Sequence, residues 1–235
     1  MSESWAERLG LAERELVAFV GAGGKSTLML GLGRELSDTG HRVVITTTTR
    51  MSVEQIEPPV VDSIRDVEAN LERRPGPVFV VRRDADAKVS GPAPTEIDKL
   101  FRESSAEYVL VEADGANGKT LKAPGNFEPV IPLTSTIVIP VAGIDAVGST
   151  ITGACHRPER VAELLGRPVS HVLAVADVAQ ILTSARGGLK DVPASARIIV
   201  AITKVSSETM DVAGELSLLI SRDPDVDRVV VVPYR

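Results

Sequence analysis

The sequence has a single cysteine, no excess of positive charge and no long apolar run. Cys155 alone excludes an internal disulfide and a metal site of several cysteines, which suits a reducing compartment. With 32 acidic and 26 basic side chains, the net charge of -6 disfavours nucleic acid and anionic membranes as partners. No segment approaches the ~20 apolar residues of a membrane span. Because Met1 to Arg8 lack the basic and apolar regions of a signal peptide, we expect a cytoplasmic protein.

What is present is enough for one large domain. The chain has 235 residues, of which 43% are hydrophobic and 25% charged, so residues 1–235 can bury a core without disulfides or metals. Apolar strand-like segments alternate with helix-like segments along the chain, and we see no repeat or linker. This order predicts an α/β fold: a P-loop-containing three-layer sandwich with a mainly parallel sheet flanked by helices.

A glycine-rich stretch from Phe19 to Thr27 follows an apolar strand and precedes an apolar-faced helix. Gly21, Gly23 and Gly24 allow a tight turn whose backbone N–H groups face an anion, with the helix dipole behind them. These features predict a phosphate-binding loop, with main-chain contacts from Gly21, Ala22, Gly23, Gly24, Lys25, Ser26 and Thr27.

Two side chains of this loop carry the expected chemistry. Lys25 would reach the β and γ phosphates, and the Ser26 hydroxyl would ligate Mg²⁺. The standard pattern has a further glycine where this chain has Phe19, so the loop is shorter than usual. The alternative is a glycine turn that binds no nucleotide, but the strand before and the helix after favour a phosphate loop.

A second strand, Arg42 to Thr46, runs into four threonines and Arg50. Thr46 and Thr47 are equally well explained as strand residues, because β-branched side chains favour strands. Thr48, Thr49 and Arg50 lie where the carboxyl end of a parallel strand faces a ligand crevice, so we expect them at the nucleotide.

The buried strand Tyr108 to Val111 delivers Glu112 and Asp114, the arrangement called Walker B. If the strand persists, both acids point to one side, and a divalent cation would relieve their repulsion. We therefore expect Asp114 to hold Mg²⁺ with Ser26, and Glu112 to orient or deprotonate the attacking water or acceptor. The alternative is a pair of surface acids in an Asp-Gly turn.

Several basic residues are weaker candidates. Lys119 is expected at the phosphates, where it or Arg50 would neutralise the transferred phosphoryl group. Lys204 stands in Thr203-Lys204-Val205-Ser206, at the place of the guanine-reading [NT]-K-x-D element, but Ser206 replaces the Asp, so ATP and GTP both stay open. We interpret the basic cluster of Arg82, Arg83 and Lys88 as a solvated rim rather than a site.

Cys155 and His156 open a predicted helix that runs through Leu165. One Cys and one His cannot complete a zinc sphere, so buried or helix-capping roles are favoured over a soft-ligand or redox site.

Together these motifs resemble the YqeC family. The resemblance rests on Val20 to Thr27, Thr46 to Arg50, Val111 to Ala116, Lys122 to Pro124, His156 to Glu159 and the Thr203-Lys204 corner. YqeC proteins are described as accessory factors for selenium-dependent molybdenum hydroxylases, or selenium cofactor biosynthesis proteins. The resemblance implies a nucleotide-binding protein that acts in this maturation, with a molybdenum hydroxylase or its cofactor as partner.

Three functions follow as hypotheses. The first is a Mg²⁺-dependent NTPase that uses ATP or GTP, with Lys25, Glu112 and Arg50 as catalytic residues. The second is a nucleotide-gated accessory or chaperone protein with little hydrolysis of its own. The third is an ATP-dependent ligase or kinase that activates an acid or hydroxyl.

Overall fold

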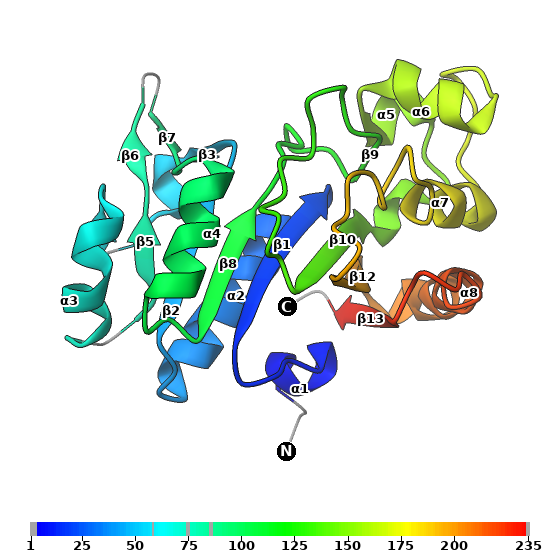
Figure 1. Cartoon of the computed structure of the whole chain (residues 1–235). Helices are drawn as coiled ribbons and strands as arrows, with labels where there is room; N and C mark the ends of the chain where they lie inside the picture. Colours follow the sequence, from blue (N-terminus) through cyan, green and yellow to red (C-terminus); the bar gives the residue numbers. More distant parts are fainter. Residues whose placement is uncertain (1–3, 58, 74–75, 85–86, 234–235) are drawn as a thin grey trace.

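The computed structural model describes residues 4–57, 59–73, 76–84 and 87–233. In this part of the chain an eight-stranded sheet has the order β13-β12-β10-β1-β8-β2-β5-β4, and every described pairing of neighbours is parallel (Figure 1). Its strands are β1 (Glu15–Gly21), β2 (Val43–Thr47), β4 (Val60–Val61), β5 (Val78–Val80), β8 (Tyr108–Glu112), β10 (Ile137–Gly143), β12 (Arg197–Val205) and β13 (Arg228–Pro233).

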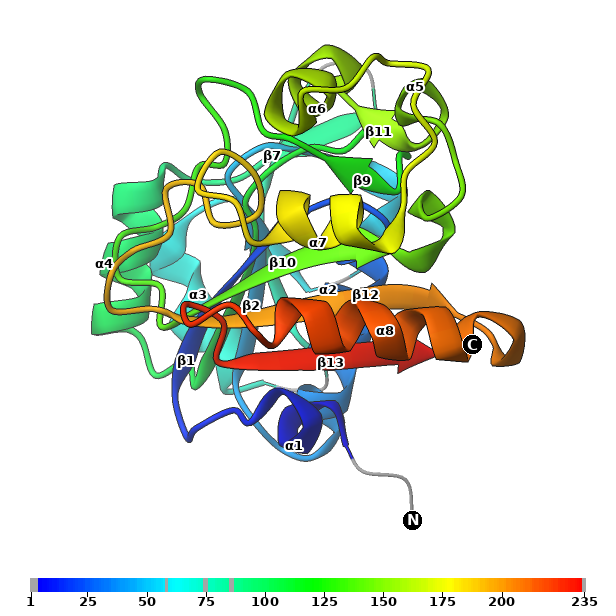
Figure 2. The ribbon, with the colours of Figure 1, turned by 90° about the vertical axis from the view of Figure 1, so that its right-hand side faces the viewer.

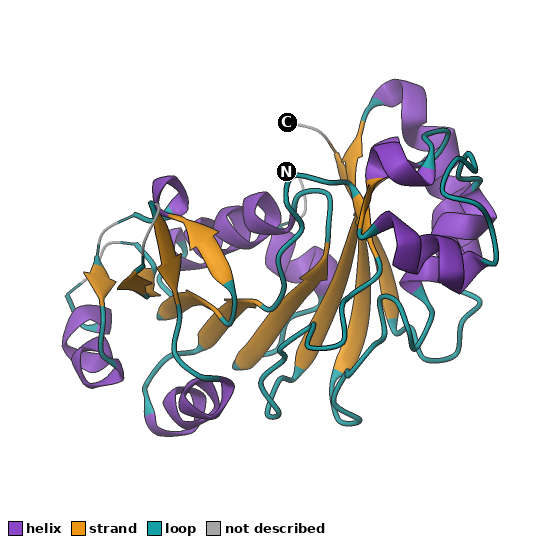
Figure 3. Cartoon of the chain, turned by 90° about the horizontal axis from the view of Figure 1, so that it is seen from above, coloured by secondary structure: helices purple, strands orange, loops and turns teal. Residues whose placement is uncertain are grey.

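Helices cover both faces of the sheet, as Figure 3 shows from above. They are α1 (Trp5–Leu9), α2 (Lys25–Asp38), α3 (Val67–Leu71), α4 (Pro94–Glu103), α5 (Ile151–Ala154), α6 (Pro158–Leu165), α7 (Val175–Leu182) and α8 (Met210–Ile220). Helices α1 and α2 share a core with one face, whereas α3 and α4, and α7 and α8, share cores with the other. Figure 2 shows α7 and α8 on the same side. The predicted three-layer α/β sandwich is therefore confirmed.

Strand burial explains this layering. In β1, Val17 and Phe19 belong to the core under α2, while Leu16 packs with α3 and α4. A strand that is apolar on both faces needs helices on both sides, because alternate side chains point to opposite faces. Helix α1 begins with a reciprocal capping box between Ser4 and Glu7.

Two small sheets accompany the main one, and the sequence analysis did not predict them. One is antiparallel and joins β3 (Arg50–Ser52), β7 (Lys88–Ser90) and β6 (Arg82–Arg83). The other pairs β9 (Leu121–Lys122) with β11 (Cys155–His156) in parallel. The expected helix start at Cys155 was wrong: the segment is a strand, and α6 begins at Pro158 after Arg157 adopts φ +58°.

The order of strands brings the candidate motifs together. Strand β1 lies between β8 and β10, and in the register Phe19 is opposite Glu112. From β1 the chain crosses over to β2 and later returns to β8 beside β1, before it continues on the other side with β10. Such a reversal places a crevice at the carboxyl ends of the strands. Within the described residues, none of the helices has the length and apolarity that crossing a bilayer requires.

Candidate functional site

The loop between β1 and α2 can be built only from glycine at two positions. Gly21 and Gly23 adopt φ +89° and +82°, which L side chains rarely adopt. A Cβ on Gly21 would lie 2.4 Å from the Val141 carbonyl oxygen, and one on Gly23 would lie 2.2 Å from the Gly143 nitrogen. The loop thus packs directly against the backbone at the end of β10.

The amides of this loop divide into two groups. Those of Ala22 and Gly23 donate to the carbonyls of Val141 and Lys119, at 2.9 and 3.0 Å, so they fix the loop to its neighbours. Helix α2 starts after Gly24, and no side chain of the described residues caps it. The first-turn amides of an uncapped helix are the donors that an anion can take up. Of the loop amides expected to face a phosphate group, only those of residues 24–27 therefore remain available.

Lys25 lies at the floor of the site. Its Nζ donates to the Gly21 carbonyl at 2.7 Å and lies 3.2 Å from Asp114 Oδ1 and 4.0 Å from Glu112 Oε1. The residue is 4% exposed. An ammonium so deeply buried needs these partners, because an unpaired charge in the interior is costly.

Ser26 and Glu112 form the closest link between the two motifs. The Ser26 hydroxyl donates to Glu112 Oε2 at 2.5 Å. Burial raises the pKa of Glu112, and the charge of Lys25 and the Ser26 hydrogen bond oppose this effect only in part. A hydroxyl and a carboxylate in contact are oxygen ligands of the kind that Mg²⁺ uses together with phosphates and waters.

Asp114 is placed differently from the expectation. Its Oδ2 accepts from the Gly21 amide at 3.0 Å and lies 3.2 Å from Lys122 Nζ, and the residue is 2% exposed. It does not line the cleft described below. Because β8 ends at Glu112, side-chain alternation no longer aligns the two acids. The structure thus brings Glu112, not Asp114, to the open side of Ser26.

Behind Asp114 a chain of paired charges continues from the interior to the surface. Lys122 has no exposed side-chain surface and lies 2.9 Å from Glu128, which also pairs with Arg157 at 3.0 Å. Burial raises the pKa of Glu128, but hydrogen bonds from Arg157 and Lys122 outweigh it and bring the pKa to about 2. The glycine loop is therefore tied through Asp114 to the segment that carries Glu128.

A cleft of about 560 Å³ opens above the glycine loop. Ten of the sequence-predicted residues line it, namely Gly23, Gly24, Lys25, Ser26, Thr27, Thr49, Arg50, Glu112, Lys119 and Lys204. Gly21, Ala22 and Thr48 do not line it, and the Thr48 hydroxyl donates to the Val130 carbonyl at 2.7 Å. The structure therefore gathers most of the predicted site in one place but turns Thr48 away from it.

Each of the basic residues predicted at the phosphates, besides Lys25, has a partner in the structure that holds it only moderately. Arg50 Nε lies 2.9 Å from Asp84, Lys119 Nζ donates to the Gly153 carbonyl at 2.9 Å, and Lys204 pairs with Asp145 at 2.8 Å. Each of these groups is at least partly exposed, so a stronger anion could replace its present partner at small cost.

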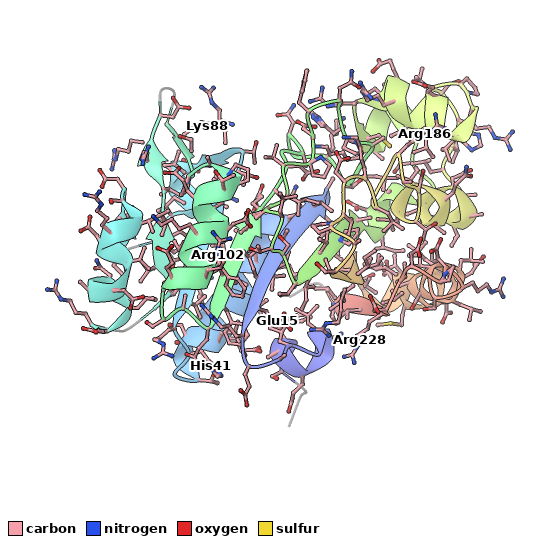
Figure 4. The ribbon with its side chains drawn as sticks, viewed as in Figure 1. Glu15, His41, Lys88, Arg102, Arg186 and Arg228 are labelled. Carbon is pink, nitrogen blue, oxygen red and sulfur yellow. The ribbon has the colours of Figure 1, made fainter. Side chains whose placement is uncertain are left out.

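The sequence analysis did not assign several other residues of the cleft to the site. Those with polar side chains include Ser52, Gln55, Lys88, Asn117 and His156. Lys88 was interpreted as a solvated rim residue, and it is exposed in hairpin β6–β7 near the top of Figure 4, but it also lines the cleft. The pairing of β11 with β9, which places His156 at the cleft, has no local sequence pattern. Burial and the nearby charges of Lys122 and Arg157 lower the pKa of His156.

A second cavity of about 480 Å³ lies on the other flank of the loop. It shares Gly23, Gly24, Thr27 and Lys204 with the first, and its remaining lining is Trp5, Leu28, Gly31, Arg34, Thr203, Val232 and Pro233. The Thr203 hydroxyl donates to the Gly23 carbonyl and, at 3.1 Å, to that of Ala142. The Thr203-Lys204 corner thus supports the glycine loop directly.

The described residues contain no group of three or more His, Cys, Asp or Glu side chains placed to hold a metal ion. A divalent cation at Ser26 and Glu112 would therefore take its remaining ligands from phosphate oxygens and water, which is how Mg²⁺ is usually bound.

Comparison with known proteins identifies relatives. The sequence model of the YqeC family, described as YqeC protein, matches residues 17–159. A protein of Escherichia coli (strain K12) named "Uncharacterized protein YqeC" is 32% identical over 226 residues, which cover 94% of this chain and 88% of the relative. Among solved structures, HypB from Helicobacter pylori in complex with nickel aligns with 94% of this chain and 79% of its own, at 10% identity and a TM-score of 0.37. By the family match and the identity to the E. coli protein, this chain belongs to the YqeC family.

Proposed function

We propose that this protein binds a Mg²⁺-nucleoside triphosphate at the glycine loop and hydrolyses it, so that water takes up the terminal phosphoryl group and the nucleoside diphosphate leaves. The observation that supports it best is the contact between Ser26 and Glu112 beside an uncapped, glycine-preceded helix start. These are the parts that a phosphate loop and a Walker B acid contribute to phosphoryl transfer.

In this proposal the nucleotide spans the two cavities. The polyphosphate lies on the amides of residues 24–27, and Lys25 exchanges the Gly21 carbonyl for phosphate oxygens. The nucleoside lies in the second cavity, whose lining is more apolar and includes Leu28 and Val232. Either ATP or GTP is compatible with this placement, because Ser206 offers no carboxylate to read guanine.

Ser26 and Glu112 would hold the Mg²⁺, in place of the Ser26 and Asp114 pair expected from sequence. A bound Mg²⁺ neutralises charge that develops on the phosphate oxygens. Arg50 and Lys119, which line the same cleft, would add positive charge at the transferred group. Asp114 would act indirectly, because its carboxylate holds the Gly21 amide and balances Lys25 and Lys122.

Removing the ammonium of Lys25 tests the proposal. We expect Lys25→Ala to weaken binding of Mg²⁺-AMP-PNP and Mg²⁺-GMP-PNP by at least ~100-fold in calorimetry, because a charge-assisted contact to phosphate is lost. Lys99→Ala, on the exposed surface of α4, is the matched control and should bind as the wild type does. Retained affinity in Lys25→Ala would remove the basis of the proposal.

The family resemblance extends the proposal to the maturation of selenium-dependent molybdenum hydroxylases in the cytoplasm. A second candidate function is nucleotide gating of a partner protein, with little intrinsic hydrolysis. The observation that favours it is that two loops contact the proposed nucleotide site through the backbone. The Gly23 amide donates to the Lys119 carbonyl, and the Thr48 amide donates to the Glu112 carbonyl. Phosphate release that appears only when a molybdenum hydroxylase is added would support gating over simple hydrolysis.

A further inference from the structure

The cleft extends well beyond the phosphate loop. Only residues 23–27 of its lining belong to that loop. The other walls come from the small antiparallel sheet, through β3 and β7, and from the segment 115–119 that follows the Walker B strand. A polyphosphate held by the loop, with its nucleoside in the second cavity, would leave these walls uncovered.

These walls carry positive charge. Arg50, Lys88 and Lys119 come from three segments and all line the cleft. Lys88 has no ion pair within the described part of the chain, and the Arg50–Asp84 pair is half exposed, so it holds Arg50 only weakly. Lys119 contacts backbone carbonyls rather than an acid.

The acids of the same cleft are already balanced. Glu112 accepts from Ser26 and lies near Lys25, and Glu128 is held between Lys122 and Arg157. The unbalanced charge of the outer walls is therefore positive, although the whole chain carries -6.

Polar side chains stand beside these cations. Ser52, Gln55, Asn117 and His156 line the cleft and offer neutral hydrogen-bonding groups. The lowered pKa of His156 favours the neutral form of its imidazole, in which one ring nitrogen can accept a hydrogen bond. Sites with a few placed polar groups and a charged residue are typical of small-molecule recognition.

From this arrangement we infer that the outer part of the cleft binds a second substrate, a small molecule with a carboxylate or phosphate group, next to the terminal phosphate of the nucleotide. The inference rests on the proposed function, since it takes the nucleotide to occupy the glycine loop. Lys88 binds the anionic group, Arg50 is shared between this group and the transferred phosphoryl group, and Ser52, Asn117 and His156 orient the rest of the molecule.

The test is a calorimetric titration of protein that has been saturated with Mg²⁺-AMP-PNP, which fills the γ-phosphate position. Inorganic phosphate and succinate are the two probes, in about 150 mM salt so that exposed charges are screened. We expect one of the probes to bind, and the identity of that probe tells phosphate from carboxylate. Lys88→Ala should weaken this binding at least ~5-fold and Lys88→Arg should restore it, with AMP-PNP affinity unchanged in both.

Arg83→Ala is the matched control, because Arg83 is an exposed cation in the same small sheet that does not line the cleft. Equal losses of probe affinity in Arg83→Ala and Lys88→Ala would show that the probe is attracted non-specifically by positive charge, and would overturn the inference. Absence of binding by both probes to AMP-PNP-saturated protein would also overturn it, and would leave the proposed function intact. Failure of AMP-PNP itself to bind would instead overturn the proposed function.

Discussion

The hydroxyl of Ser26 and the carboxylate of Glu112 are joined by a hydrogen bond of 2.5 Å between α2 and the end of β8. The two residues are 86 positions apart in the sequence, so the contact exists only because β1 and β8 are neighbours in the sheet. This hydrogen bond links the first turn of α2 to the end of β8, and the prediction for Glu112 depends on that link.

Glu112→Gln keeps the size of the side chain and removes its charge. We expect nucleotide affinity without Mg²⁺ to stay within ~3-fold of the wild type, while phosphate release with Mg²⁺ falls by at least ~100-fold. Steady-state phosphate release and calorimetry with and without Mg²⁺ measure both effects. Glu103→Gln, in an exposed ion pair on α4, is the control. An unchanged rate of phosphate release would mean that residues other than Glu112 hold the metal ion and position the attacking water.

Asp114→Ala should mainly reduce the stability of the folded protein. Asp114 is buried, accepts from the Gly21 amide and balances Lys25 and Lys122, so its removal leaves buried donors and charges unpaired. We expect a loss of about 3–5 kcal/mol in the free energy of unfolding, measured with urea. Exposed Glu103→Ala should cost less than ~1 kcal/mol. Similar losses in the two variants would contradict the structural role of Asp114.

Gly23→Ala should disrupt the glycine loop. Its Cβ would lie 2.2 Å from Gly143 N and 2.6 Å from the Thr120 carbonyl, in a backbone conformation that alanine rarely adopts. We expect nucleotide affinity to fall at least ~30-fold, with a loss of about 2 kcal/mol in stability. Gly214→Ala, in α8 with no atom within 4 Å of the added Cβ, should instead be neutral or stabilising by up to about 1 kcal/mol. Near-normal nucleotide binding by Gly23→Ala would argue against phosphate contact at this loop.

The pKa of Glu128 gives a pH-dependent prediction. Its pKa is lowered from 4.5 to about 2 in the folded protein, so its stabilising effect is complete above pH ~4.5 and disappears as pH falls toward ~2. Wild type should exceed Glu128→Gln in free energy of unfolding by at most ~3 kcal/mol near neutral pH. The difference should shrink across this acid range in urea titrations at several pH values. A difference that is constant with pH would show that the ion pairs of Glu128 do not set its effect.

Gly31→Leu tests the placement of the nucleoside. Gly31 lines the second cavity, and an added Cβ meets no atom within 4 Å, so the fold should accept the larger side chain. By filling the cavity it should weaken binding of nucleoside triphosphate by about 10-fold and leave inorganic triphosphate unaffected. Gly214→Leu, on α8, controls for the added apolar side chain. Equal effects on both ligands would place the nucleoside elsewhere.

Local patterns predicted much of this protein. Apolar runs and helical periodicity predicted the strands and helices of the main sheet, and the order of elements predicted the three-layer α/β class. The glycines, Lys25 and Ser26 predicted a phosphate loop, because such a loop requires a tight turn, a cation and a hydroxyl within a few residues of one another. The two acids at the end of β8 were also identified from sequence, but the choice between Glu112 and Asp114 as the partner of Ser26 depended on where the strand ends.

Local sequence patterns could not predict the contacts between segments that are far apart in the chain. No local feature marks the pairing of β9 with β11, the small sheet that brings Lys88 to the cleft, or the burial of Lys122 between Asp114 and Glu128.

The sequence by itself determined the fold class and the glycine-rich loop between the first strand and helix, since both follow from periodicity and from residue chemistry within a few positions. Tertiary structure alone decided which carboxylate meets Ser26, which amides stay available and which side chains form the outer cleft. The physical reason is that these features depend on strand neighbours and on the packing of charges from segments far apart in the chain.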